Sequence, residues 1–368
     1  MSGRILGLIT AAGLSSRMGA FKPLLDLDGK PLIARTVESM LQGGASQIVL
    51  VTGRNGDELE EALLGYPEVI RVHNAAFRET AMFDSIKIGL KQMMELGSCD
   101  AFLVMPADIP AIRPETIQGL LEEWQKETPD VLYPVCQGEQ GHPPVVKGAK
   151  IPELLRDCGE LGLRGAFARV CPNALEVTVS DPATLMDADY KEDYEALCAY
   201  WPNRYYPKLS QCEIFYEMAG TPKKVQEHSK AVRKKALEIG RELKKKGISL
   251  NLDLIESAAL LHDVKRTEPH HAVAGAEFLQ KQGLKEVAEP VLIHMDWPSD
   301  RTIAPDEAAV LYLADKLVSG DQNVSLEERF LQKERRFAED AEILANIQKR
   351  KNAALKIKAC FEEYGLKF

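Results

Sequence analysis

Short apolar runs alternate with amphipathic stretches along the first 200 residues. The apolar runs are typical of buried strands and occupy residues 4–10, 47–53, 69–74, 101–108 and 131–135. The stretches between them carry apolar residues at helical spacing and occupy residues 31–41, 58–65, 84–96 and 114–127. Because short apolar runs separated by helices indicate parallel strands covered on both faces, the pattern predicts an α/β domain with a doubly wound, mostly parallel sheet. Ligands of such a sheet bind at the carboxyl ends of its strands.

The pattern changes near residue 200, after which strand signals vanish. The segment 201–210 contains two prolines and has no clear period, so we interpret it as a linker between domains 1–200 and 211–368. Helical spacing follows in residues 223–247, 253–264, 271–283, 287–296 and 306–319, which predicts an all-α second domain. The charged stretch 325–368 is also helical in spacing. It either closes this domain, which we favour, or presents a surface to a partner.

Composition and charge narrow the class of protein. The chain has 368 residues, 45% hydrophobic and 27% charged, which excludes disordered and fibrous chains and favours two globular domains. Residues 1–204 carry 19 Lys and Arg against 29 Asp and Glu, and the remainder carries 27 against 26, which argues against nucleic-acid binding. We find no membrane span or signal peptide in the sequence, and the seven scattered cysteines indicate reduced thiols, so we expect a cytoplasmic protein.

A glycine-rich loop follows the first predicted strand. Residues 11–25 read AAGLSSRMGAFKPLL, and Gly13 and Gly19 allow backbone N–H groups to approach a polyphosphate. Arg17 and Lys22 add cations that can contact phosphate oxygens. The glycines alone would favour an ordinary turn between a strand and a helix.

The whole segment AAGLSSRMGAFKPLLDLDGKPLI resembles the signature of the MobA-like nucleotidyltransferases, above all the molybdenum cofactor cytidylyltransferases. The resemblance implies a nucleotide site, formed by residues Ala11, Ala12, Gly13, Ser15, Gly19 and Lys22. Cytidylyl members resemble this chain in Ala11-Ala12-Gly13, whereas guanylyl members usually have a second glycine in place of Ala12. A methyl group at Ala12 also leaves less room beside the base, which favours a pyrimidine.

The resemblance extends to a magnesium site and an acceptor site. Asp108, in VMPADIP, stands where the family carries a magnesium-binding Asp-x-Pro, and Asp187 and Asp189 resemble its closing Asp-x-Asp. Tyr190-Lys191 replaces the usual Thr-Pro, so the choice between Asp187 and Asp189 stays open. The implied acceptor-binding residues are Asn74, Ser85, His142 and Arg164. Thr80-Ala81 stands where the family usually has a glycine, so the acceptor pocket can differ from that of the family; His142 has the alternative interpretation of a hydrogen-bonded loop histidine.

Histidines concentrate in the second half. Five of the seven lie between residues 228 and 294, and imidazole with carboxylate suits first-row divalent metals. The doublet His262-Asp263 after an apolar helical run resembles the HD-domain phosphohydrolases. That resemblance implies six metal ligands, which are His228, His262, Asp263, His271, His294 and Asp315. His271 is chosen over His270 because the family histidine stands four residues before the glycine of Gly-Ala, here Gly275-Ala276; Lys265 receives no role.

Together these resemblances imply a fusion enzyme. The first domain would transfer a cytidylyl group from CTP to the phosphate of molybdopterin with Mg²⁺, using Arg17, Lys22 and Asp108 for catalysis. The second would hydrolyse a phosphate compound with one or two ions such as Mn, Fe, Ni or Co. The alternatives are another phosphorylated acceptor, such as a sugar or polyol phosphate, and an HD domain kept as a metal-binding or regulatory module. A molybdoenzyme or its chaperone would be the partner that receives the cofactor.

Overall fold

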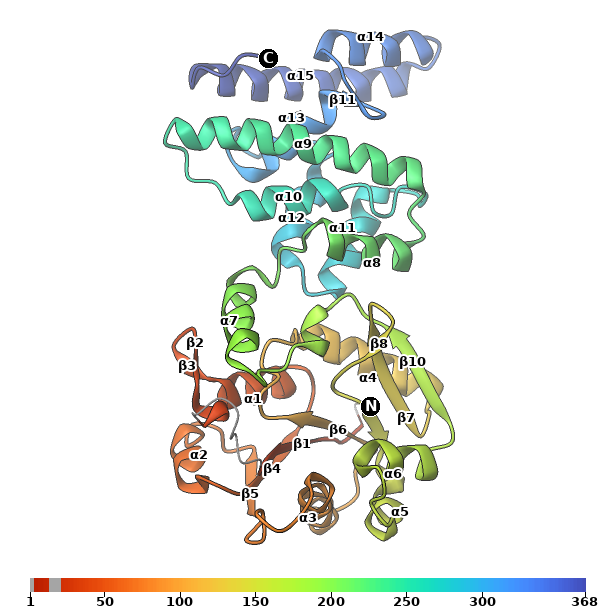
Figure 1. The fold of residues 1–368 in the computed structure, drawn as a ribbon. Coiled ribbons are helices and arrows are strands. Elements are labelled where there is room, and N and C mark those ends of the chain that lie inside the picture. Colours follow the sequence, from red (N-terminus) through yellow and green to blue (C-terminus); the bar gives the residue numbers. More distant parts are fainter. Residues whose placement is uncertain (1–2, 13–20) are drawn as a thin grey trace. The chain divides into compact units, whose positions relative to one another are not determined.

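The computed structural model describes residues 3–12 and 21–368, and the chain separates into two compact units, residues 1–204 and 205–368 (Figure 1). The predicted linker 201–210 contains a 3-10 turn at Trp201–Asn203 and, from Leu209, the first turn of a helix. In the described part of the chain, no helix is long and apolar enough to cross a membrane.

The first unit is built on one mixed sheet with the order β10-β7-β9-β6-β1-β4-β5, and β8 pairs with β7. Its strands are β1 (Ile5–Ala11), β4 (Gln47–Thr52), β5 (Val69–His73), β6 (Ala101–Pro106), β7 (Val131–Cys136), β8 (Glu139–Gln140), β9 (Val145–Lys147) and β10 (Ala174–Thr178). A separate small hairpin consists of β2 (Asp26–Leu27) and β3 (Lys30–Pro31). Neighbours β5-β4-β1-β6 and β7-β10 run parallel, whereas β9 runs antiparallel between β6 and β7.

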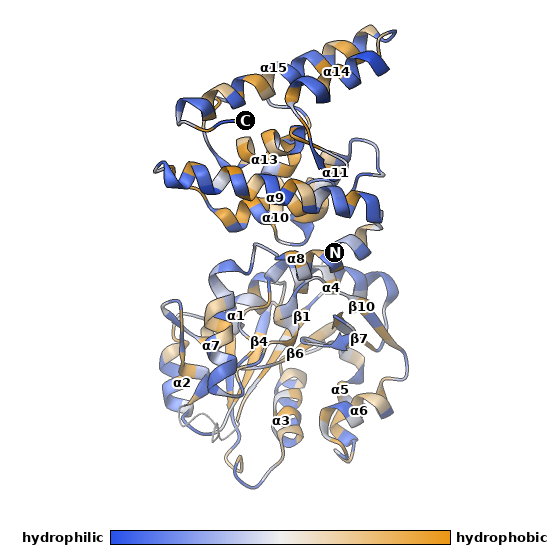
Figure 2. Ribbon diagram, turned by 45° about the horizontal axis from the view of Figure 1, so that its top comes forward, coloured by the Kyte–Doolittle hydropathy of each residue, from blue (hydrophilic) through white to orange (hydrophobic). Residues whose placement is uncertain are grey.

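Helices cover this sheet and connect its strands. They are α1 (Leu32–Gln42), α2 (Gly56–Ala62), α3 (Met82–Glu95), α4 (Pro114–Glu127), α5 (Ile151–Arg156), α6 (Gly162–Val170) and α7 (Lys191–Tyr200). The strands at the centre of the sheet are predominantly hydrophobic (Figure 2), and β1 is buried along almost its whole length. Gly89 lets α3 approach β1 closely, because a Cβ there would come within 2.3 Å of the Leu8 side chain. The predicted doubly wound, mostly parallel α/β class is confirmed.

The second unit is helical apart from one short hairpin. Its helices are α8 (Leu209–Ala219), α9 (Lys223–Lys245), α10 (Leu252–Leu261), α11 (His271–Lys281), α12 (Lys285–Ile293), α13 (Glu307–Lys316), α14 (Leu326–Arg336) and α15 (Ala341–Glu363). The hairpin, which the sequence did not indicate, pairs β11 (Val318–Ser319) with β12 (Gln322–Asn323). Helix α13 is buried from Ala308 to its end, as expected for the centre of a helical core.

The charged tail belongs to this core. Phe330 of α14 and Ile347, Ala354, Ile357 and Phe361 of α15 are buried in the same apolar cluster as α10 and α13. Their spacing buries one face of each helix and leaves the charged face outside. The tail therefore closes the helical unit, as the favoured interpretation of the sequence has it.

Candidate functional site

A cavity of about 380 Å³ lies where β1 and β6 end. In the sheet, β1 lies between β4 and β6. The chain continues from β1 to β4 and β5 on one side and then crosses to β6 on the other side, so the cavity lies at the switch point of a doubly wound sheet. Six of the residues predicted from the sequence line it, and these are Ala11, Ala12, Lys22, Ser85, Asp108 and Asp189. The predicted residues Gly13, Ser15, Arg17 and Gly19 lie outside the described residues.

Lys22 joins the two carboxylates of this cavity. Its side chain is nearly buried, and Nζ lies 2.6 Å from Oδ1 of Asp189 and 3.6 Å from Oδ2 of Asp108. Burial raises the pKa of Asp108, and Asp189 adds to the rise while Lys22 opposes it. The pKa of Asp187 is also raised, by burial and then by Asp189 and Asp108, although Asp187 does not line the cavity.

Burial is the main cause of the raised pKa of both Asp108 and Asp187, so these carboxylates lie where an ionised group is poorly solvated. Carboxylate oxygens are the ligands that Mg²⁺ prefers. Asp108 and Asp189 therefore fit a hard divalent cation between them, with Asp187 close enough to add to the field.

A buried aspartate anchors the segment that leads to Asp187 and Asp189. Asp181 is fully buried, and its Oδ2 accepts hydrogen bonds from the backbone N–H of Arg113 at 2.8 Å and from Oγ1 of Thr116 at 2.9 Å. Both donors belong to the start of α4, so this contact holds the segment after β10 against a helix of the sheet. No local pattern in the sequence indicates this contact, because Thr116 and Asp181 are 65 residues apart.

Asn74 and Ser85 shape one wall of the cavity. Nδ2 of buried Asn74 donates to Oγ of Ser85 at 2.9 Å and to Oγ1 of Thr80 at 3.0 Å, and its Oδ1 accepts from the N–H of Ala76. The Asn74 side chain thus forms its hydrogen bonds with other residues of the protein and holds the loop before α3 in place. Asn74 does not line the cavity itself. Ser85 and Thr80 line the cavity themselves.

The structure does not bring His142 and Arg164 to this cavity. His142 is held by its backbone, whose N–H donates to the carbonyl of Thr184 at 2.8 Å, and burial lowers the pKa of its imidazole. Arg164 is exposed in the first turn of α6. Neither residue lines the cavity, so the geometry gives no support to their assignment as acceptor ligands.

Arg78 is a cavity residue that the sequence analysis missed. It lines the cavity from the loop after β5, with its guanidinium 5.6 Å from the ring centroid of Phe77, which also lines the cavity. The available signal was a basic residue shortly after the carboxyl end of a parallel strand, where ligands of this fold bind.

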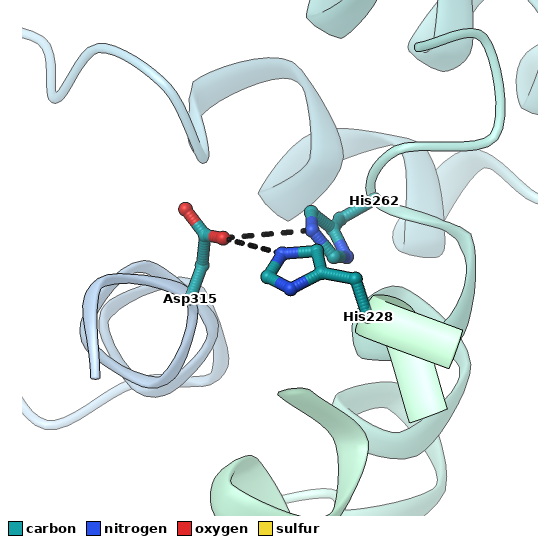
Figure 3. A group of neighbouring side chains, drawn as sticks. All are labelled: His228, His262 and Asp315. Atoms are coloured by element: carbon teal, nitrogen blue, oxygen red, sulfur yellow. Dashed lines mark hydrogen bonds and ion pairs between the residues drawn. The ribbon is translucent and has the colours of Figure 1, made fainter. Parts of the chain in front are cut away.

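The six metal ligands predicted for the second unit converge on one place. His228 projects from α9 and Asp315 from α13, while the doublet 262–263 and His294 immediately follow α10 and α12. Nε2 of His228 lies 3.1 Å and Nε2 of His262 3.7 Å from Oδ1 of Asp315 (Figure 3).

Asp263 forms the other half of this cluster. Its Oδ1 lies 3.2 Å from Nε2 of His271 and 3.4 Å from Nε2 of His294. His228, His262 and Asp315 form one group tight enough for a metal ion, and His262, Asp263 and His294 form another.

Carbonyl groups fix the orientation of three of these rings. Nδ1 of His262 lies 2.8 Å from the carbonyl of Ala259, and Nδ1 of His294 lies 2.6 Å from that of Val291. Nδ1 of His228 lies 2.7 Å from the carbonyl of Gly320. Because a carbonyl can only accept, each Nδ1 carries a proton, and Nε2 is the ring atom that each histidine can offer to a metal ion.

The cluster contains buried atoms that need a partner. Nε2 of His262, Nε2 of His294 and Oδ1 of Asp263 are buried and form no hydrogen bond with any described residue. Burial lowers the pKa of His262 to about 4, so this ring is neutral at pH 7 and offers a lone pair. Since orphaned buried acceptors are costly, the ligand set fits divalent metal ions.

The residues next to the predicted ligands differ in whether they contact the cluster. His270 is exposed with a left-handed backbone (φ 50°), whereas His271 begins α11 inside the cluster. Lys265 pairs with Glu268 at 2.9 Å and takes no part in the cluster. Arg266, which the sequence analysis did not consider, lies with Nη1 2.8 Å from Nε2 of His271 and 3.6 Å (through Nε) from Oδ2 of Asp263.

Comparisons with known proteins agree with this division. Residues 7–175 match the model of the MobA-like NTP transferase domain, and residues 225–320 match that of the HD domain. The molybdenum cofactor cytidylyltransferase of Escherichia coli is 25% identical over 187 residues, which are 51% of this chain and 92% of that protein. The bifunctional protein GlmU of Geobacter metallireducens is 30% identical over 122 residues, which are 33% of this chain but only 25% of GlmU.

Among solved structures, a nucleotidyl transferase from Methanothermobacter is 24% identical with a TM-score of 0.46, over 54% of this chain and 98% of that one. The two matched segments fall in the two compact units, the first on the sheet whose edge carries Lys22 and Asp108 and the second on the helices that carry the histidine cluster. The chain therefore joins a MobA-like NTP transferase domain to an HD domain.

Proposed function

We propose that the first unit transfers a cytidylyl group from CTP to the phosphate of molybdopterin and releases pyrophosphate. The observation that carries this proposal is Lys22 between Asp108 and Asp189 in a cavity at the carboxyl ends of β1 and β6. The likeness to the E. coli molybdenum cofactor cytidylyltransferase over nearly its whole length supports the choice of nucleotide and acceptor.

The chemistry needs little beyond positioning and charge. The acceptor phosphate is already an anionic nucleophile, so no side chain has to remove a proton from it. Negative charge gathers on the α-phosphate in the transition state, and the Lys22 ammonium can offset it from a nearly buried position where electrostatic interactions are strong. Mg²⁺ held by Asp108 and Asp189 would supply further neutralisation of the phosphate charge when bound.

Lys22 is placed to contact both the carboxylates and a substrate. Its ammonium pairs with Asp189 at 2.6 Å and lies near Asp108. The same ammonium can turn to a phosphate oxygen of the nucleotide, and the carboxylates can then pair with a divalent cation.

The nucleotide and the acceptor can be tested together. Purified protein incubated with CTP, Mg²⁺ and molybdopterin should yield a product heavier than the acceptor by one cytidylyl group, and an Asp108→Ala variant should not. Thr80 and Ala81 line the cavity where the family usually has a glycine, so the acceptor pocket can differ and sugar or polyol phosphates form the second acceptor class. A product found only with a sugar or polyol phosphate would replace molybdopterin by that class.

We further propose that the second unit is a metal-dependent phosphohydrolase. Two groups of ligands that share His262 support this proposal, because adjacent divalent ions would supply activation of a water and neutralisation of a phosphate. The chain's own contribution is to hold the His262 and His294 rings by their Nδ1 atoms with the lone pairs of Nε2 facing the cluster. Release of phosphate from a broad panel of phosphate compounds with Mn²⁺, Ni²⁺, Co²⁺ or Fe²⁺ would test it, and tight metal binding without hydrolysis would favour a regulatory module.

A further inference from the structure

Basic side chains surround the opening of the histidine cluster. A cavity of about 250 Å³ is lined by His228, Asp263 and Asp315. The same cavity is lined by four cations from three segments of the chain, which are Lys224, Arg266, Arg329 and Lys333. A cluster that needed only to hold metal ions would not require cations at its mouth.

Two of these cations come from α14, beyond the segment that matches the HD domain, which ends at residue 320. Arg329 and Lys333 are four residues apart, so they lie on one face of the helix. Burial of Phe330 and Leu326 in the core fixes the helix with this face toward the cavity. The tail that closes the fold thus also brings charge to the cluster.

Neither of these two residues is matched by a carboxylate. Nε of Arg329 is buried without a hydrogen-bond partner among the described residues, and neither Arg329 nor Lys333 forms an ion pair with any of them. Burial lowers the pKa of Lys333 to about 8; the charges of Arg329 and Lys316 add to the effect, and that of Asp315 opposes it. Lys316 differs, since its Nζ already donates to Oδ2 of Asp315 at 2.7 Å and to the carbonyl of His294 at 2.8 Å.

Crowded, half-buried cations without carboxylate partners are unfavourable unless an anion binds between them. Arg329 and Lys333 line the same cavity as the metal-ligand cluster but are not part of the cluster, so a second phosphate linked to one at the cluster could bind against them. We propose that this site takes a substrate with at least two linked phosphate groups, one at the cluster and the next against Arg329 and Lys333. This proposal rests on the phosphohydrolase function proposed above.

The reaction is hydrolysis of a phosphoanhydride. The oxygen of a water forms a bond to the phosphorus at the cluster, and the bond from that phosphorus to the bridging oxygen breaks. The departing phosphate keeps the electron pair of the broken bond, and the protons of the water pass to the released phosphates or to solvent. Inorganic pyrophosphate and nucleoside diphosphates share this chemistry, and pyrophosphate is also what the proposed transferase would release.

The test compares linked and single phosphates on the full chain with Mn²⁺. Hydrolysis of pyrophosphate, CDP, CMP and p-nitrophenyl phosphate is measured for the wild type and for R329Q/K333Q, which keeps most of each side chain's bulk. The control is R335Q, because Arg335 is exposed on the same helix and does not line the cavity. Binding of methylenediphosphonate, which cannot be hydrolysed, is measured by calorimetry, and metal content is measured for each variant.

We expect the wild type to prefer CDP to CMP, and the double variant to raise KM for the linked phosphates at least about tenfold. The Kd for methylenediphosphonate should rise by a similar factor, while metal content, p-nitrophenyl phosphate hydrolysis and the R335Q control stay within about twofold. Pyrophosphate hydrolysed faster than CDP would identify the inorganic member of the class, and the reverse would identify the nucleotide.

Equal hydrolysis of CMP and CDP by the wild type, with no change in R329Q/K333Q, would overturn the proposal. An equal loss with single and linked phosphates would do the same, because it would mean a general effect on the cluster. If the wild type hydrolyses no phosphate compound, the phosphohydrolase function fails, and methylenediphosphonate binding then decides separately whether the cations select linked phosphates. If the double variant loses its metal, R329K/K333R tests the same cations with charge retained and should bind methylenediphosphonate within about threefold of the wild type.

Discussion

The two candidate sites of this chain are built in different ways. The cluster in the helical unit consists of rings whose Nδ1 atoms are tied to carbonyls, and His262 and His294 are almost completely buried. The cavity at the sheet edge relies on carboxylates in loops, and the side chain of Asp189 remains 42% exposed. The first arrangement is held by contacts with the backbone, whereas the second is held by a lysine that the substrate would engage.

This difference has a physical origin. Helix ends place a histidine next to the carbonyl three residues earlier, so the backbone itself orients the ring. A parallel sheet determines only where a site lies, at the carboxyl ends of its strands. The side chains that bind the ligand come from the loops that follow these strands. Side chains in loops suit a transferase, which must admit and release a nucleotide. Rings held by the backbone suit a metal centre.

Replacing Asp108 should distinguish the activities of the two sites most clearly. Asp108→Ala should abolish Mg²⁺-dependent pyrophosphate release, because it removes the carboxylate best placed to hold the metal with Asp189. Circular dichroism should stay unchanged, and metal bound to the histidine cluster should remain. Activity at the wild-type level would refute the assignment of Asp108.

The opposite change removes the doublet of the helical unit. His262→Ala and Asp263→Ala should each abolish hydrolysis and reduce the bound metal from about two equivalents, since each residue faces other ligands of the cluster. His270→Ala is the matched control, because His270 is exposed beside the cluster. Both doublet variants should retain cytidylyl transfer, and hydrolysis that persists in them would locate that activity elsewhere.

Lys22 should have a smaller effect than Asp108. Lys22→Ala should lower kcat of the transferase by roughly a factor of 10² if the ammonium stabilises the transition state. A change in KM alone would mean that Lys22 binds the nucleotide and contributes nothing to the chemical step. Lys22→Arg retains the charge and should recover part of the loss.

The smallest predicted effect concerns the base. Pyrophosphate release with CTP should exceed that with GTP by at least about tenfold, which is about 1.4 kcal/mol. Ala12→Gly should reduce this preference, because it removes the methyl group from the cavity wall. Equal rates of wild-type protein with both nucleotides would contradict the argument from Ala12.

The sequence predicted the fold class because buried parallel strands leave continuous apolar runs, as in residues 101–106. It missed β10, whose residues alternate between exposed and half-buried, and β2, β3 and β8, which have only two residues each. Short and edge strands bury too little to leave a pattern.

The same reasoning explains what was found and missed at the sites. The six ligands of the helical cluster came from a spaced motif of rare residue types, and the structure brings all six together. Arg329 and Lys333 could not be identified from the sequence, because they lie among many charged residues of a helical tail. The spacing of apolar residues identifies the buried face of a helix, but it does not show which polar residue lines a cavity. His142 and Arg164 fitted a family pattern, yet neither lines the sheet-edge cavity.

We propose that the cytidylyltransferase activity of this chain resides in its first unit and does not depend on the histidine cluster of the second. The direct test is mass spectrometry of the products that wild-type, Asp108→Ala and His262→Ala protein form from CTP and molybdopterin. We expect a cytidylylated acceptor with wild-type and His262→Ala protein and an unmodified acceptor with Asp108→Ala. An unmodified acceptor with wild-type protein, or a product that depends on His262 and not on Asp108, would contradict this proposal.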